Sequence, residues 1–205
     1  MKHYILLFIT TIIPFFNTKA QVVKINNGLS ISKMKNDKLS LFEKTIDTYS
    51  LFFGIDYLSG KYYEMSSEVG YIAKGGKEQG VYINDNPNYN TWNIIAKKSY
   101  ININTTFRLK FPFNNSYIYA GAGPKIDFIT GNNEFKNIYL SGYKLSNTIF
   151  GLKTEIGINQ ILNRNFLAGI STCYWIDFNR FAYSDYTRLG NRTISIFITI
   201  GYILN

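Results

Sequence analysis

Large apolar residues alternate with small or polar ones over long stretches of this chain. From Thr193 to Tyr202, every second residue is isoleucine or tyrosine, and the positions between them carry threonine, serine, glycine and one phenylalanine. Because successive side chains of a β-strand point to opposite faces, this pattern predicts a strand with one apolar face. The ranges 49–57, 100–111 and 150–159 show the same alternation. The chain is therefore predicted to fold from β-strands.

Four less regular candidates bring the number of strands to eight: residues 22–33, 62–74, 116–130 and 165–178. An even number of antiparallel strands suits a closed up-and-down barrel. Beyond residue 21 no apolar run reaches 18 residues, which excludes helical membrane spans. We therefore predict an all-β, eight-stranded antiparallel transmembrane β-barrel. Pro124 lacks an N–H group, so its strand is expected to contain a bulge or another local irregularity.

The connections between these strands alternate in length. Those near residues 59–60, 113–115 and 162–164 are short, whereas four others are each about a dozen residues or longer, at 34–46, 75–97, 131–147 and 179–190. Outer-membrane barrels have short periplasmic turns and long extracellular loops. This alternation places both ends of the strand series on the periplasmic side.

The first twenty residues are typical of a Sec signal peptide. Lys2 gives a basic tip, residues 4–16 form a short apolar run, and Thr18 and Ala20 are small residues of the kind that precede a cleavage site. An uncleaved anchor helix is the alternative, but the run is short for a membrane span and Pro14 interrupts it. We expect residues 1–20 to be removed, and residues 21–205 to form one outer-membrane barrel domain.

The residue inventory limits the possible chemistry. The only histidine is His3, within the predicted signal peptide, so the mature chain has no imidazole for a Ser-His-Asp or Cys-His site. Glu64 and Glu68 lie on one strand face, about 13 Å apart at roughly 3.3 Å per residue, too far for direct cooperation. The glycine-rich segment 121–123 is not followed by a helical pattern, which argues against a nucleotide site. No cofactor or metal is expected.

Charge indicates the kind of partner. Residues 21–205 carry 20 basic and 13 acidic residues, a formal charge of +7. For an exported protein, this excess favours lipopolysaccharide phosphate or an acidic glycan over nucleic acid as an anionic partner, although a solvated basic surface is the more common explanation.

Volume decides which face of the barrel points inward. Eight strands enclose just enough room for side chains, and a face made of isoleucine, leucine, phenylalanine and tyrosine would overfill it. The apolar face is therefore expected to contact lipid, and the face rich in glycine, serine, threonine and asparagine to fill the lumen. Aromatic residues near strand ends are expected to form interfacial girdles. They are Tyr49, Tyr57, Tyr63, Tyr71, Phe111, Tyr117, Phe128, Phe166, Tyr174 and Tyr202.

This orientation directs six acidic and five basic side chains into the lumen. They are Lys24, Asp56, Glu64, Glu68, Arg108, Lys110, Lys125, Asp127, Lys153, Glu155 and Asp177. Enclosed charges must be paired or hydrated, so we expect a salt-bridge and hydrogen-bond network that fills the lumen. A narrow path for ions or protons is the alternative.

Two segments resemble the PorT-like outer-membrane β-barrel family. The segment from Tyr62 to Gly76 is similar to that family's third strand, which ends in a Lys-Gly pair, and the segment from Tyr117 to Pro124 is similar to its fifth. The similarity covers Val22 to Leu204. It implies a small outer-membrane barrel, and the familiar member supports gliding and protein secretion. The chain departs from the usual ending because Ile203-Leu204-Asn205 replaces a terminal aromatic residue; Tyr202 would then serve in recognition by the barrel-assembly machinery.

These features predict a non-enzymatic barrel that acts in envelope structure, in surface interaction, or as an accessory of a secretion or gliding assembly. Its expected partners are outer-membrane lipid, lipopolysaccharide and the proteins of such an assembly or of an adhesion complex. Tyr82, Tyr89 and Trp92 give the second long connection an aromatic character suited to binding. The alternatives are a narrow pore for small solutes and, with less support, a lipid-modifying enzyme.

Overall fold

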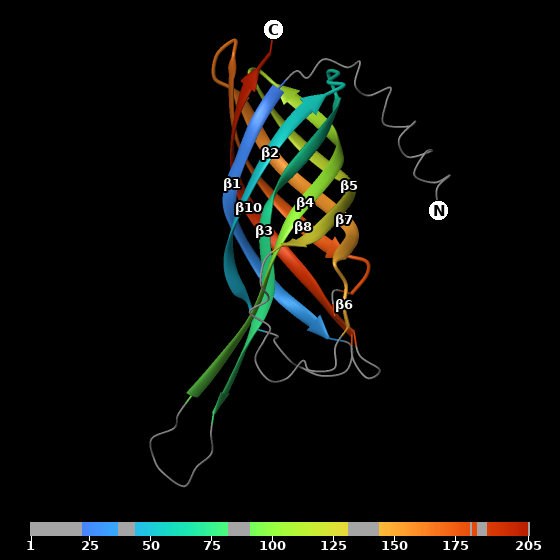
Figure 1. The fold of residues 1–205 in the computed structure, drawn as a ribbon. Coiled ribbons are helices and arrows are strands. Elements are labelled where there is room, and N and C mark those ends of the chain that lie inside the picture. Colours follow the sequence, from blue (N-terminus) through green and yellow to red (C-terminus); the bar gives the residue numbers. More distant parts are fainter. Residues whose placement is uncertain are drawn as a thin grey trace, which may run out of the picture.

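Eight long antiparallel strands form a closed barrel (Figure 1). The structure, a computed structural model, describes residues 22–36, 44–81, 91–130, 144–180, 182–183 and 188–204. The eight strands are β1 (Val22–Asn36), β2 (Ile46–Tyr57), β3 (Tyr63–Val81), β4 (Thr91–Phe113), β5 (Ser116–Thr130), β7 (Thr148–Ile161), β8 (Phe166–Asp177) and β10 (Arg188–Ile203). Each pairs with the next in this order, and β10 pairs with β1. The predicted eight-stranded antiparallel barrel is confirmed.

Two short strands add to the end of the barrel that carries the long connections. They are β6 (Lys144–Leu145) and β9 (Ala182–Tyr183), of which β9 pairs with both β10 and β6. In the described part of the chain, no helix is long and apolar enough to cross a membrane. The predicted signal peptide, residues 1–20, lies outside the described residues.

The strands are staggered around the barrel. Following the register from Val22 on β1 through each neighbouring strand, across a two-residue gap of equal length on β4 and β5, leads back to β1 at Ser32, ten residues further along. Such a stagger makes the strands tilt, typically by 35–45° from the barrel axis. A tilted eight-stranded barrel has a narrow interior that side chains can fill.

The turns at one end are as short as predicted. Only Asn114 and Asn115 separate β4 from β5, and Asn114 has a φ of 48°, a left-handed conformation that asparagine tolerates in tight hairpins. The strand series begins and ends at this same end, because Val22 pairs with Ile203.

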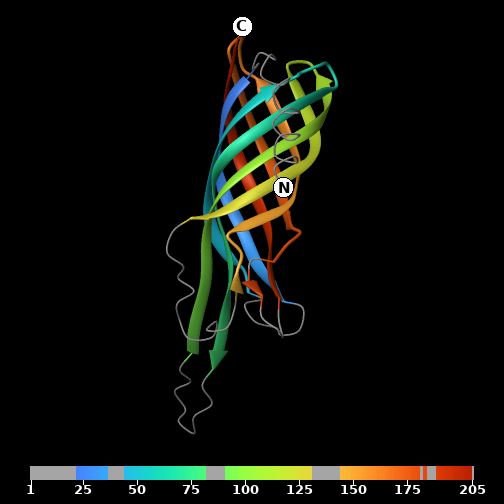
Figure 2. The ribbon, with the colours of Figure 1, turned by 45° about the vertical axis from the view of Figure 1, so that its right-hand side comes forward.

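The connection predicted at residues 75–97 is instead mostly strand. β3 continues to Val81, β4 begins at Thr91, and the two remain paired over their whole length. They form a hairpin that projects well beyond the other strands (Figures 1 and 2). Outside the barrel wall a hairpin no longer has to separate a lumen from an apolar belt. The period-two alternation that revealed the other strands is therefore lost there.

Pro124 interrupts the pairing between β4 and β5 without adding a residue. The pairs Asn104 with Lys125 and Phe107 with Ala122 flank a gap of equal length on both strands. On the other side of β5, Pro124 still lies opposite Leu152. The predicted irregularity is present, and it is a gap in the ladder rather than a bulge.

The outer face of the barrel is an apolar belt. Leu29, Ile198 and Ile200 are each more than 60 % exposed, and isoleucines and phenylalanines of every long strand except β3 share this face. Most charged residues within the barrel wall are instead buried on the inner face. The apolar face thus points outward and the polar face inward, as the narrow interior predicts.

Two aromatic residues depart from the predicted girdles. Tyr117 lies on the inward face of β5, where its hydroxyl accepts a hydrogen bond from Asn159 at 2.9 Å. Tyr117 lies an even number of residues from Lys125 and Asp127 on the same strand. Since those two side chains are predicted to point inward, the alternation directs Tyr117 inward as well. Tyr57 is buried, and its hydroxyl lies 2.9 Å from that of Ser67. The other eight are exposed or partly exposed on the outer face.

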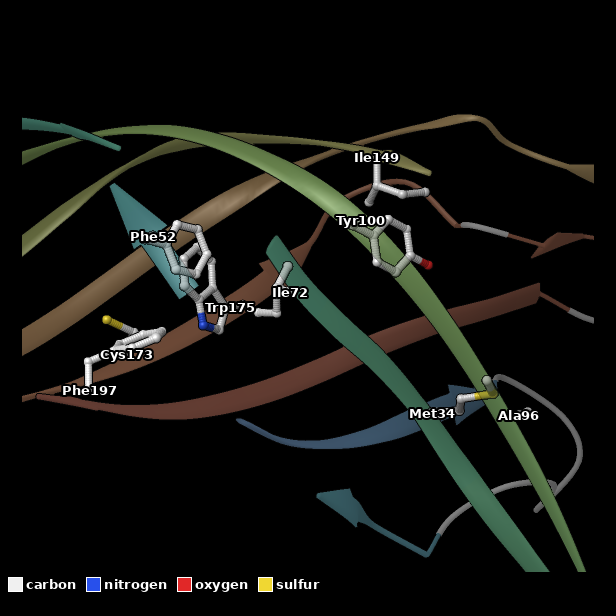
Figure 3. Packing of buried hydrophobic residues seen from close by; sticks show 9 residues of the cluster. All are labelled: Met34, Phe52, Ile72, Ala96, Tyr100, Ile149, Cys173, Trp175 and Phe197. Atoms are coloured by element: carbon white, nitrogen blue, oxygen red, sulfur yellow. The ribbon is translucent and has the colours of Figure 1, made fainter. Parts of the chain in front are cut away.

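The lumen also contains an apolar layer, so it is less uniformly small and polar than expected. Phe52 stacks on Trp175 with 5.5 Å between ring centroids, and Phe197 meets Phe52 edge-on at the same distance (Figure 3). Gly28 leaves the room for Phe197, because a Cβ at Gly28 would lie 2.8 Å from that ring. The cluster also includes Met34, Ile72, Ala96, Tyr100, Ile149 and Cys173.

The two faces can be distinguished by tryptophan fluorescence in vesicles with brominated acyl chains. With Trp92→Phe, Trp175 is the only tryptophan, and we expect no quenching because Trp175 is buried in the lumen. With Trp92→Phe, Trp175→Phe and Ile198→Trp, we expect strong quenching because Ile198 is 63 % exposed on the belt. Equal quenching of the two variants would contradict the orientation.

Candidate functional site: the charged lumen

Charged side chains gather on the inner wall of the barrel. All eleven residues predicted for the lumen are placed there, and each takes part in at least one ion pair. Nearly all of these side chains are almost fully buried; Lys110, near the short-turn end, is the most exposed, at 10 %. The alternation of each strand explains the placement, because residues two apart share the inward face.

Arg108 is the centre of the larger group, which we call the Arg108 cluster. Its Nε contacts Glu155 at 2.5 Å, and its Nη2 lies 3.4 Å from Glu68. Its Nη1 lies 3.3 Å from Asp56 and 3.2 Å from Glu64. A planar guanidinium with five N–H donors can serve several carboxylates at once, which an ammonium group does less well.

Three lysines complete the Arg108 cluster. Lys24 lies 2.7 Å from Asp56 and 3.4 Å from Glu68. Lys153 lies 2.6 Å from Glu68 and 2.9 Å from Glu155, and Lys110 lies 3.4 Å from Glu64. The cluster thus contains four basic and four acidic side chains.

A smaller group lies nearer the projecting hairpin, and we call it the Lys74 cluster. Lys74 lies 2.6 Å from Asp127 and 3.4 Å from Asp177, and Lys125 contacts the same two carboxylates at 2.5 and 2.6 Å. Lys74 is not among the predicted lumen charges. Lys74 lies six residues after Glu68 on the same strand. Because every second residue faces inward, continuing the alternation from Glu64 and Glu68 identifies Lys74 as a lumen residue. With Lys74, the two clusters hold six basic and six acidic side chains. Lys98, opposite Lys74 on β4, is also buried, and the predicted set does not include it.

Asparagines and one tryptophan connect the two clusters. Lys153 donates to Asn104 at 3.3 Å, Asn104 donates to Asn102 at 2.8 Å, and Asn102 donates to Asp127. The Trp175 ring lies 5.5 Å from the ammonium of Lys153 and 6.0 Å from that of Lys74. Its Nε1 donates to Ser195 at 2.8 Å. The polar and apolar parts of the lumen therefore form one packed unit.

The aromatic loop residues are less well placed. Tyr82 and Tyr89 lie outside the described residues. Trp92 lies on β4 opposite Gly80, toward the far end of the projecting hairpin.

The arrangement favours a structural role over a chemical one. Every carboxylate of the two clusters contacts a cation, so each is held in an ion pair rather than presented to a substrate. In the ranges that the structure describes, no group of three or more histidine, cysteine, aspartate or glutamate side chains could hold a metal ion. Filling the lumen with paired charges stabilises the barrel only while the partners are complete.

Removing Arg108 tests this dependence. Arg108→Met leaves four buried carboxylates short of a cation and should destabilise the barrel by about 3–5 kcal/mol. Lys110→Met, two residues away on the same strand, removes a charge that forms an ion pair with Glu64 alone and should cost much less. Urea unfolding in lipid vesicles measures both. Equal losses of stability in the two variants would contradict a central role for Arg108. Adding Glu155→Gln to Arg108→Met should recover part of the lost stability, because it removes one of the carboxylates left without its partner.

Comparisons with known proteins show the fold. No family model matches this chain, and no curated protein matches it either. Among solved structures, Neisserial surface protein A (NspA) is similar with a TM-score of 0.51 and 9 % identity, covering 89 % of this chain and 97 % of that one. The outer membrane protein AlkL, solved in DMPC bilayers, is similar with a TM-score of 0.52 and 10 % identity, covering 91 % of each chain. The chain thus shares the fold of small outer-membrane β-barrels.

Proposed function

We propose that this chain is a non-enzymatic outer-membrane barrel that acts through its outer and loop surfaces rather than through its lumen. The observation that carries the proposal is the pairing of twelve buried lumen charges around a packed aromatic layer. Arg108, Lys74 and Trp175 are all at most 1 % exposed, so the body of the barrel is occupied by its own side chains.

The outer belt supports the membrane location. A soluble protein rarely exposes an apolar surface of this size, whereas a barrel in lipid requires one. The predicted Sec signal peptide supplies the export route, and the short-turn end would then face the periplasm. The PorT-like resemblance fits such a barrel and favours an accessory role in a secretion or gliding assembly.

A pore is the less favoured alternative. For an ion to pass, it would have to displace buried pairs such as Lys74 with Asp127, and breaking a buried pair is strongly unfavourable. An enzyme is also less favoured, because Glu64 and Glu68 both contact Arg108 instead of lining an open site.

The surface most suited to contact is the projecting β3–β4 hairpin, which extends beyond the remaining strands (Figure 2). We propose that Trp92, on the hairpin, and Tyr82 and Tyr89, in the segment of the chain between its two strands, contribute binding contacts. Roles in envelope structure, adhesion or a secretion assembly would all use this surface, with lipopolysaccharide as lipid neighbour and the barrel-assembly machinery as partner during insertion.

Conductance separates a filled barrel from a pore. Purified protein in planar bilayers should show no steady current, because the lumen charges are paired and the aromatic layer is packed. An outer-membrane porin reconstituted in the same way serves as the positive control. A steady open channel from the folded protein would contradict the proposal.

Complementation of a deletion strain tests the surface role. We expect the triple variant Tyr82→Ala, Tyr89→Ala and Trp92→Ala to fail to restore the lost envelope, gliding or secretion phenotype. Lys110→Gln, a lumen change near the short-turn end, should restore it. Both variants must first show heat-modifiable migration in gels, which reports a folded barrel. The reverse result would indicate that the lumen, not the hairpin, carries the function.

A further inference from the structure

A groove of about 970 Å³ runs along the outer face of β1 and β10. Ile25, Leu29 and Ile31 line it from β1, and isoleucines of β10 line the facing side. Asn27 lies in the middle of this row and contributes a smaller, polar side chain. The hollow therefore interrupts an otherwise continuous belt of branched side chains.

Asn27 is unusual for its position. It is exposed on the outer face, and it makes no side-chain hydrogen bond to any described residue. A polar amide in the middle of a lipid-facing belt is unfavourable unless a partner contacts it. The groove and its polar floor thus indicate an occupant with both apolar and polar parts.

Two cations lie at one end of the groove. Lys33 and Arg192 are directly opposite each other in the ladder, and both are exposed on the outer face. They follow Ile31 and Ile194, the last apolar pair of the groove. Like charges on directly opposite strand positions repel, and within the described residues neither side chain forms an ion pair. A multivalent anion between them would relieve this repulsion.

One acidic residue also borders the groove. Asp47 is exposed and lies opposite Ile31 in the ladder. It is therefore two residues further along the groove, away from the end that carries Lys33 and Arg192. It does not form an ion pair with Lys33 or Arg192 in the described structure. The rim therefore keeps a net positive charge, two cations against one carboxylate.

The geometry matches a lipid of one leaflet. Ile25 to Ile31 spans about 20 Å along the strand, and with the usual strand tilt this is about 15 Å of depth. The apolar band of an outer-membrane barrel is about 25 Å thick, so the groove covers slightly more than half of it. The cations lie at the end opposite the short turns, which is the extracellular side in the proposed function.

We propose that this groove binds the phosphorylated lipid of the outer leaflet, lipid A, with an acyl chain against Leu29 and a phosphate between Lys33 and Arg192. The inference rests on the proposed outer-membrane location. A second copy of the chain fits less well, because a two-fold dimer through this face would bring the two cation pairs together.

Binding to purified diphosphoryl lipid A tests the proposal, with the folded protein in phosphatidylcholine nanodiscs and retained lipid measured by native mass spectrometry. Lys33→Gln with Arg192→Gln should weaken binding by at least about tenfold, since two charge-assisted contacts are lost. Lys61→Gln with Arg164→Gln makes the same change in exposed residues of the short turns and should leave binding unchanged. Lipid A without phosphates should bind only weakly to the wild-type protein. Its affinity should match that of diphosphoryl lipid A for the Lys33→Gln, Arg192→Gln variant.

The apolar half of the site has its own test. Asn27→Trp fills the groove and should reduce lipid A binding, whereas Ile103→Trp, on the same belt but on β4, should not. Equal binding by wild type and the Lys33/Arg192 variant, equal losses in both double variants, or crosslinking of two copies through this face would overturn the proposal. In those cases heat-modifiable migration and the absence of conductance would still support the proposed function, which fails only if the protein does not insert or conducts steadily.

Discussion

The barrel depends on one arginine in its centre. Arg108, on β4, joins carboxylates from β2, β3 and β7, so it connects β4 with two strands, β2 and β7, that do not pair with it in the ladder. Backbone ladders hold only neighbouring strands together. The guanidinium adds contacts across the lumen, and its four acidic partners would be unstable in a buried site without it. The inner charges and the closure of the barrel therefore stabilise each other.

The charges also fix the register. A slip of one residue on any strand would move its inward side chains to the outer face. For β7, such a slip would expose Lys153 and Glu155 to the apolar surroundings of the belt and bury isoleucines in a lumen that has no room for them. Both errors are costly, and they occur together. The alternation thus specifies one register, because both the inner and the outer face reject a strand shifted by one residue.

Most of the fold could be predicted from this alternation, because the barrel wall separates two different surroundings at every residue. The eleven predicted lumen charges followed from parity alone. The projecting hairpin could not be found in this way, since beyond the wall its two faces no longer differ. Phe52 and Trp175 show a second limit: parity places a side chain inside, but only the packed structure shows which large side chains meet there. Tyr117 shows a third limit: its place near a strand end predicts a girdle position, but the alternation along β5 turns its side chain inward.

The distribution of charge links the lumen to the outer surface. The network uses six basic and six acidic residues, so it contributes nothing to the net charge. Of the charged residues in 21–205, 14 basic and seven acidic ones remain outside the network. The basic excess therefore comes from residues outside this network. Lys33 and Arg192 belong to this excess, and their place at the end of an apolar groove is where an anionic lipid would require them.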